Sequence, residues 1–257
     1  MTVIMQKDDF NFRFIVVKLF SIVILKMRHL LLLHGAIGAK GQLDDLAQRL
    51  EDKFHVHYFN FSGHGGNRFP HAEFSIPHFG HDVLEEMKQN DIKQASFFGY
   101  SMGGYVAMWL AKYFPDKIDK VITLATKFYW DEQVAAKEIK MLNADVMQEK
   151  VPAFAQQLQQ RHAPNDWKVV LEKTKEMLLA LGRNNELKPD DYQSIFTPCL
   201  LLLGENDKMI TVDETIAVKN ALPHAELKFL TATPHPIEQV DKILLASVIE
   251  NFLLDSK

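Results

Sequence analysis

The sequence marks Ser101 most clearly as a residue that could do chemistry. It lies in GYSMG at residues 99–103, a G-x-S-x-G segment between an apolar run and a helical run. A strand that turns this sharply into a helix strains the serine backbone and needs small residues on either side. The hydroxyl then projects beyond the strand end, which predicts that Ser101 is a nucleophile. A glycine-rich turn with serine as the helix cap is the alternative.

A serine hydroxyl is a poor nucleophile until a neutral imidazole takes its proton. His235, in PHPIE at residues 234–238, is the candidate base, and Asp207, in GEND at residues 204–207, is the candidate acid that orients the imidazole. The chain order of serine, aspartate and histidine fits a nucleophile on a strand-to-helix turn. Glu205 and Asp131 are rival acids. Asp207 is preferred because it lies far enough into its loop to turn back toward His235.

Attack on a carbonyl creates a negatively charged oxygen that needs N–H donors. In this arrangement one donor comes from the loop after the first buried strand, and the other comes from the residue after the nucleophile. The segment HGA at residues 34–36 follows such an apolar run. The backbone N–H groups of Ala36 and Met102 are therefore the predicted oxyanion hole, and His34 is expected to bond within its own loop.

The elements that must position these residues alternate along the chain from Arg28 onward. Short apolar runs predict strands at residues 30–33, 56–61, 95–100, 120–125, 199–203 and 227–230. Longer amphipathic runs predict helices at residues 42–50, 79–87, 103–113, 211–222 and 237–254. The alternation indicates an α/β fold with a mostly parallel sheet covered by helices on both faces. Residues 131–191 contain no convincing strand, and we expect about three inserted helices there.

Composition limits the function classes. The chain has 257 residues, 47% of them hydrophobic, which is enough for one sizeable core. Its net charge of −4 and the lack of a long basic run argue against a nucleic-acid partner. Cys199 is the single cysteine and cannot form an internal disulfide, which fits a reducing, cytoplasmic location. No close Cys/His pairing predicts a metal site.

Residues 1–26 form an N-terminal extension of uncertain role. The apolar run at residues 14–25 is broken by Lys18 and is shorter than the roughly 20 residues that span a membrane. Three interpretations fit: an extra strand or hairpin, a weak membrane anchor, or sequence translated upstream of a start at Met27. Because every motif lies after Met27, we expect residues 1–26 to be dispensable for catalysis.

From about Arg28 to the C-terminus the sequence resembles the α/β-hydrolase superfamily. The resemblance rests on HGAIGA at residues 34–39, FSGHGG at 61–66, GYSMGG at 99–104, GEND and PHPIE. It implies an eight-stranded, mostly parallel sheet, a helical cap inserted after the sixth strand, and no metal or organic cofactor. Residues 131–191 fall where the cap belongs, between core segments 27–130 and 192–257. One departure is Ser62, where many members have proline.

A cap over the nucleophile predicts a pocket at the boundary between cap and core, the kind of place where ligand sites form. Lys127, Tyr129 and Trp130 lie where the chain passes into the cap. We expect at least one of them to line the pocket, with either aromatic residue as an apolar wall and Lys127 as an anchor for an anionic group. The expected partner is a small to medium, largely apolar molecule with one negative end.

The leading functional hypothesis is hydrolysis of a carboxylic ester or related acyl compound through an acyl-enzyme. Two alternatives remain open, because one fold hosts many reactions. The same triad could serve a lyase or a C–C bond hydrolase, although Tyr105 stands where an elimination enzyme of menaquinone synthesis commonly has arginine. The other alternative is a non-catalytic protein that only binds a ligand.

Overall fold

The structure is a computed structural model that describes residues 27–255. The three interpretations of residues 14–25 lie outside the described residues. A sheet of six parallel strands forms the centre of the molecule, in the order β2-β1-β3-β4-β5-β6. The strands are β1 (Arg28–Leu33), β2 (Phe54–Tyr58), β3 (Ala95–Tyr100), β4 (Ile118–Leu124), β5 (Cys199–Gly204) and β6 (Ala225–Leu230).

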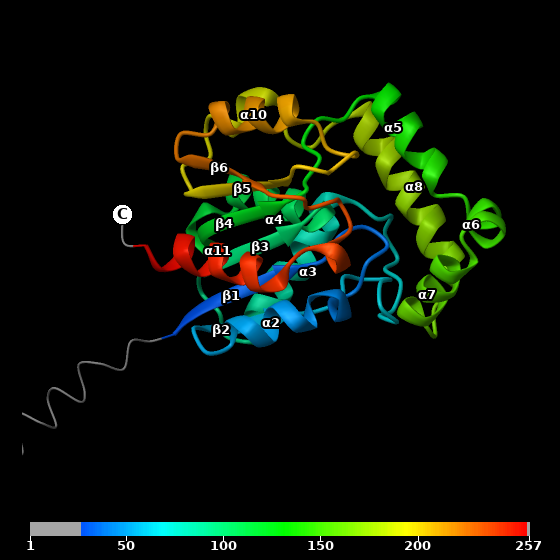
Figure 1. Ribbon diagram of the computed structural model, residues 1–257, viewed down its shortest axis with the longest axis horizontal. Helices are drawn as coiled ribbons and strands as arrows, with labels where there is room; N and C mark the ends of the chain where they lie inside the picture. Colours follow the sequence, from blue (N-terminus) through cyan, green and yellow to red (C-terminus); the bar gives the residue numbers. More distant parts are fainter. Residues whose placement is uncertain (1–26, 256–257) are drawn as a thin grey trace, which may run out of the picture.

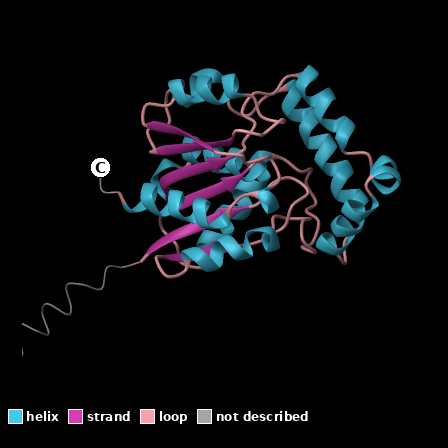
Figure 2. Ribbon diagram, in the orientation of Figure 1, coloured by secondary structure: helices cyan, strands magenta, loops and turns pink. Residues whose placement is uncertain are grey.

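Helices cover both faces of the sheet (Figures 1 and 2). One face carries α2 (Asp44–Leu50) and α11 (Lys242–Leu254), and the other carries α3 (Ile76–Gln89), α4 (Met102–Tyr113) and α10 (Val212–Ala221). Successive strand side chains point to opposite faces, so the apolar run of β1 supplies both cores. Leu31 and Leu33 pack with α3 and α4, whereas Leu30 and Leu32 pack with α2 and α11. This two-sided burial explains why the central strands are continuously apolar.

Five helices lie between β4 and β5. They are α5 (Glu132–Glu138), α6 (Ala144–Lys150), α7 (Pro152–His162), α8 (Trp167–Arg183) and α9 (Pro189–Tyr192). Helix α5 packs against α8, and α6 packs against α7. In Figure 1, α5 to α8 gather at one side of the sheet domain, and we call these four helices the cap.

The strand count differs from the expected eight. Residues 27–255 form six strands, and each connection between them is a crossover between parallel strands. The expected helix over residues 237–254 is also split. A short 3₁₀ turn (Ile237–Gln239) comes first, and Asp241 then caps α11 by accepting the N–H groups of Ile243 and Leu244.

No helix within residues 27–255 is long and apolar enough to cross a membrane.

Candidate active site

Ser101 occupies the sharp turn from β3 into α4. Its backbone has φ 52° and ψ −117°, a left-handed conformation that non-glycine residues rarely adopt. The turn admits no side chain at its flanking glycines. A Cβ on Gly99 would lie 2.4 Å from the carbonyl carbon of Gly103, and a Cβ on Gly103 would lie 2.4 Å from the carbonyl oxygen of Leu33. The two glycines are therefore required by close backbone approach.

Neighbouring elements hold this turn on both sides. The N–H of Ser101 donates to the carbonyl of Leu124 at 2.8 Å, and the Thr126 hydroxyl donates to the Ser101 carbonyl at 3.1 Å. Tyr100 donates its hydroxyl to the carbonyl of His235 at 3.2 Å. The end of β4 thus fixes the serine backbone, and the residue before the serine fixes the histidine loop.

His235 and Asp207 meet above the ends of β5 and β6. His235 Nδ1 lies 2.8 Å from Asp207 Oδ2. The other oxygen, Oδ1, accepts the N–H groups of Met209 at 2.8 Å and Ile210 at 3.1 Å. Burial alone would raise the pKa of the Asp207 carboxyl, but the hydrogen bond and charge of His235, with these two N–H groups, hold that pKa below its usual value. An ionised Asp207 accepts the Nδ1–H and leaves Nε2 free to take a proton.

The rival acids are engaged elsewhere. Asp131 caps α5, where its Oδ1 accepts the N–H of Val134 at 2.7 Å. Glu205 accepts the N–H of Ala232 at 3.2 Å. Within residues 27–255, neither carboxylate contacts His235, so the geometry favours Asp207 over both.

The backbone N–H groups of Ala36 and Met102 have no hydrogen-bond acceptor among the described residues. Met102 is the first residue of α4, where an N–H has no partner within the helix and the helix dipole favours negative charge. Both residues line the same cavity as Ser101 and His235. This arrangement can stabilise an oxyanion formed on a substrate carbonyl.

The loop that carries Ala36 is fixed from two directions. Phe61 donates its N–H to His34 Nε2 at 3.2 Å, so His34 Nδ1–H donates to the Gly35 carbonyl at 2.8 Å. Burial lowers the pKa of His34 to about 4 and keeps its ring neutral. Ile37 has φ 49°, which is strained for a β-branched residue.

Two side chains at the end of α7 bind the carbonyl of Ile37. Arg161 Nη1 donates to it at 3.2 Å, and His162 Nε2 donates at 3.0 Å. His162 Nδ1 also accepts the N–H of Gly65 at 3.1 Å, and Arg161 pairs with Glu238 at 3.0 Å. No sequence motif signalled these two residues, because the contacts depend on how the cap docks.

A cavity of about 530 Å³ lies between the cap and the carboxyl ends of the strands. Ser101, His235, Ala36 and Met102 lie at its core side. Its cap-side wall is mainly apolar and includes Met141, Val146, Met147, Val151, Phe154, Met177, Leu178 and Leu181. Residues from the core and the cap thus enclose Ser101, as is common for ligand sites.

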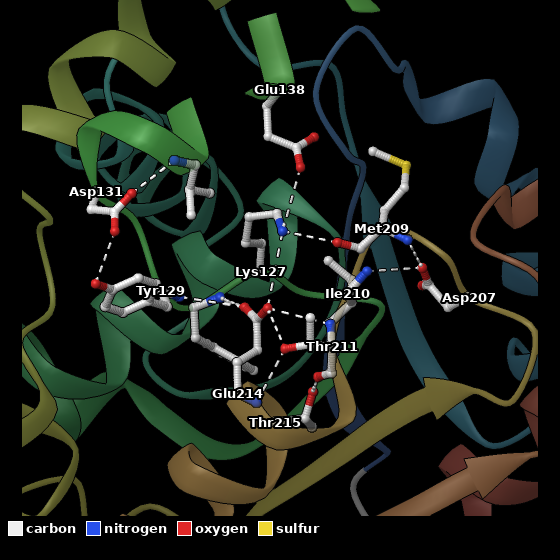
Figure 3. Close-up of polar contacts among 12 residues, drawn as sticks. Lys127, Tyr129, Asp131, Glu138, Asp207, Met209, Ile210, Thr211, Glu214 and Thr215 are labelled. Carbon is white, nitrogen blue, oxygen red and sulfur yellow. Dashed lines mark hydrogen bonds and ion pairs between the residues drawn. The ribbon is translucent and has the colours of Figure 1, made fainter. Parts of the chain in front are cut away.

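The three predicted pocket residues differ in their placement. Trp130 and Lys127 line the cavity. Tyr129 does not: its side chain is 54% exposed and its hydroxyl donates to Asp131. Lys127 is also not a free anchor, because Nζ donates to the Met209 carbonyl at 2.8 Å and lies 3.4 Å from Glu138 Oε1 (Figure 3).

Within residues 27–255, no group of three or more histidine, cysteine or acidic side chains could hold a metal ion.

The family model for the alpha/beta hydrolase fold matches residues 28–167, more than half of the chain. The chain therefore belongs to the α/β-hydrolase fold family.

Curated relatives agree with this assignment. A pimeloyl-[acyl-carrier protein] methyl ester esterase of Vibrio cholerae is 25% identical over 233 residues, which cover 80% of this chain and 86% of that enzyme. The 3-oxoadipate enol-lactonase 2 of Acinetobacter baylyi is 37% identical over 76 residues, only 30% of this chain and 28% of that enzyme. The chain thus matches less than a third of the lactonase.

A solved structure shares the fold. The enol-lactonase of Burkholderia xenovorans superposes with a TM-score of 0.74 at 19% identity, over 90% of this chain and 92% of that one. The match shows a common fold.

Proposed function

We propose that this protein is a serine hydrolase that cleaves a small to medium, largely apolar carboxylic ester or related acyl compound through an acyl-enzyme. The observation that carries the proposal is the 2.8 Å contact of His235 with the buried Asp207, beside a cavity that also holds the strained Ser101. Ser101, Asp207 and His235 follow β3, β5 and β6, so the parallel sheet brings the proposed nucleophile, acid and base to the same edge, where the triad mechanism can use them.

In the first half-reaction, Ser101 Oγ attacks the substrate carbonyl and its proton passes to His235 Nε2. The carbonyl π electrons move onto oxygen, and the N–H groups of Ala36 and Met102 stabilise the resulting charge. When the tetrahedral species collapses, the bond to the leaving oxygen breaks. His235 returns the proton to that oxygen, so an alcohol leaves and an ester to Ser101 remains.

In the second half-reaction, water takes the place of the alcohol. His235 removes a proton from the water as its oxygen attacks the acyl carbon. Collapse of the second tetrahedral species releases the carboxylic acid and returns the proton to Ser101. Asp207 stays ionised throughout and stabilises the imidazolium in both steps.

The cavity walls support an apolar acyl or alcohol group. The methionine, leucine, valine and phenylalanine side chains of the cap offer apolar surface, whose burial gives about 25 cal/mol per Å². Because Lys127 is bound by Met209 and Glu138, a negative end on the substrate would meet another cation. Lys140 lines the cavity and has no ion pair within the described part of the chain.

Two measurements on the purified protein test the proposal. A fluorophosphonate probe should form one covalent adduct per chain at Ser101, and none in Ser101→Ala. With an ester whose acyl-enzyme hydrolyses more slowly than it forms, a chromogenic substrate should give a burst of coloured alcohol followed by a slower steady rate. Ser101→Ala should lose several orders of magnitude in kcat, as about 10⁶ is lost in subtilisin, while its melting temperature stays close to wild type.

Other outcomes separate the alternatives. Adduct formation without ester turnover would favour a lyase or a C–C bond hydrolase that uses the same serine. Absence of the adduct in folded protein would favour a ligand-binding protein and overturn the proposal.

A further inference from the structure

Lys127 places a buried positive charge between the cap and the loop that carries the acid (Figure 3). The side chain is 13% exposed and belongs to the segment that leaves β4 for the cap. Its Nζ donates to the Met209 carbonyl at 2.8 Å and lies 3.4 Å from Glu138 Oε1 and 4.0 Å from Glu214 Oε2. Three separate elements therefore converge on one ammonium group.

The carbonyl that Lys127 binds belongs to the same peptide group as the N–H of Ile210. That N–H donates to Asp207 Oδ1 at 3.1 Å, beside the Met209 N–H at 2.8 Å. A cation on the carbonyl oxygen polarises the peptide and strengthens its N–H as a donor. Lys127 thus acts on Asp207 through one peptide unit, and Asp207 acts on His235 through the 2.8 Å bond.

Glu214 holds the same two segments together. Its Oε1 accepts the N–H groups of Phe128 at 3.0 Å and Tyr129 at 3.4 Å. Its Oε2 accepts the N–H and hydroxyl of Thr211 at 3.3 and 3.0 Å. The segment that carries Lys127 is therefore fixed relative to the turn that carries Met209, and the ammonium cannot move far from its carbonyl partner.

Charge balance explains why the ammonium stays in this position. Glu138 and Glu214 are 8% and 13% exposed, and Lys127 is the cation between them. Removal of one member of a mostly buried ion pair leaves an uncompensated charge, which is strongly destabilising. A substrate anion would have to compete with two fixed carboxylates for this site.

We propose that Lys127 is a positioning residue for the catalytic acid, holding the Met209–Ile210 peptide so that Asp207 keeps His235 in its working orientation. This inference rests on the proposed triad. It also assigns Glu138 of cap helix α5 a role in holding the ammonium, so the cap contributes to the geometry of the triad.

The test uses Lys127→Met, which keeps the length of the side chain and removes the charge. A second variant, Lys127→Met with Glu138→Gln, restores the wild-type net charge of the cluster and guards against misfolding of the single variant. Lys112→Met is the matched control. Lys112 is also partly buried, pairs with Asp191 at 3.0 Å, and lies in the last turn of α4, away from Ser101.

Both Lys127 variants should lose roughly 10- to 100-fold in kcat on a chromogenic ester, because small misplacements of catalytic groups have effects of that size. KM should change little, and the acid limb of the kcat/KM profile should move to lower pH, since a loosened Asp207 stabilises the imidazolium less. Lys112→Met should keep the wild-type kcat and profile.

An NMR titration of the His235 ring provides a readout that does not need turnover. Its pH midpoint should be lower in both Lys127 variants than in wild type, whether or not the wild-type protein hydrolyses the ester. An unchanged midpoint in the folded double variant overturns the inference and leaves the proposed function standing. A higher KM at wild-type kcat also overturns it, because Lys127 would then contact the substrate. Failure of the wild-type protein to hydrolyse esters or accept the probe counts against the proposed function alone.

Discussion

At the scale of single residues, the side chain of Asp207 is fully buried and is stabilised by polar groups on several sides. Its carboxylate receives two backbone N–H groups and the His235 ring, and Lys127 acts on it through one of those peptide groups. Among the described residues, Glu205, two positions earlier, accepts a hydrogen bond only from the N–H of Ala232. The two carboxylates lie in one loop, but Asp207 contacts the His235 ring and Glu205 does not.

Asp207→Asn should therefore reduce kcat by about 10³- to 10⁴-fold with little change in fold, as a comparable change does in a serine protease. The amide cannot stabilise the imidazolium and favours the wrong ring tautomer. Glu205→Gln should change kcat less than about threefold, because Glu205 lies outside the reacting groups. Steady-state kinetics with one ester measure both. The opposite ranking would move the acid to Glu205, and two mild effects would point to Asp131.

Residues with a local signature were predictable from the sequence. Ser101, His235 and Asp207 each follow a strand within a short motif, so their placement at the same edge of the sheet could be inferred from the chain order of strands and motifs. The direction of Tyr129 could not be inferred, because adjacency to Trp130 in a loop does not fix which side chain faces inward. The capping pattern Thr211-x-x-Glu214 can be read from the sequence. The hydrogen bonds that Glu214 accepts from the N–H groups of residues 128 and 129 depend on tertiary packing and could not be predicted.

At the scale of elements, the segment between β4 and the cap joins the sheet domain to the cap and lines part of the cavity. Trp130 lines the cavity there, together with methionine and leucine side chains of the cap region. Trp130→Ala removes a large apolar surface from the cavity, together with the contacts of a partly buried side chain at the margin of the core.

In Trp130→Ala, relative rates along a series of acyl chain lengths should shift toward longer chains, because the enlarged cavity accepts more methylene groups. A change of about 10-fold in selectivity is reasonable, since one methylene in an apolar pocket accounts for roughly 1–3 kcal/mol. The melting temperature should fall by only a few degrees. Rates for a series of chromogenic esters measure the selectivity, and identical relative rates in both proteins would show that this wall does not select the substrate.

The elements themselves were largely predictable, but their ends and number in the cap were not. The central strands follow continuous apolar runs, which have few alternative explanations at that length. Between β4 and β5 the chain forms five helices rather than about three, and one reason is that Asn143 begins a helix within an amphipathic stretch that contains no proline or glycine. The expected C-terminal helix similarly failed to continue through Val240 and Asp241.

At the scale of the whole molecule, three buried histidines lie where the core meets the cap. Burial lowers the pKa of His34 and of His162 to about 4, and that of His64 to well below its usual value. The charge of the neighbouring Arg161 lowers the pKa of His34 and His162 further. These rings are neutral in the folded protein at neutral pH, whereas in the unfolded chain they bind protons near pH 6.5.

The free energy of unfolding should consequently fall as the pH drops from 6.5 to about 4. In that window the unfolded chain binds more protons than the folded chain, and each such histidine adds up to about 1.4 kcal/mol per pH unit. Urea unfolding at several pH values measures the slope. His162→Gln, whose amide can replace both ring contacts, should make the slope shallower. The control His224→Gln, at an exposed position, should leave the slope unchanged.

Every residue of the proposed site lies within residues 27–255, together with all six strands of the described sheet. A chain that begins at Met27 should therefore retain the kcat and KM of the full chain within about twofold. Expression of both forms, followed by ester kinetics at matched concentrations, tests this. Insolubility of the shorter chain, or a large loss of rate, would show that residues 1–26 are needed.

The two hydrogen bonds from Arg161 and His162 to the Ile37 carbonyl limit how the cap can move when substrate enters and product leaves. If α7 swung away like a lid, both bonds would break, and the strained residue beside Ala36 would be released at the same moment. With α7 displaced, the backbone N–H of Ala36 would no longer be held in the position where we propose that it stabilises an oxyanion. If the cap instead stays docked while the product leaves, both bonds persist, so we expect the rate of product release not to depend on movement of α7.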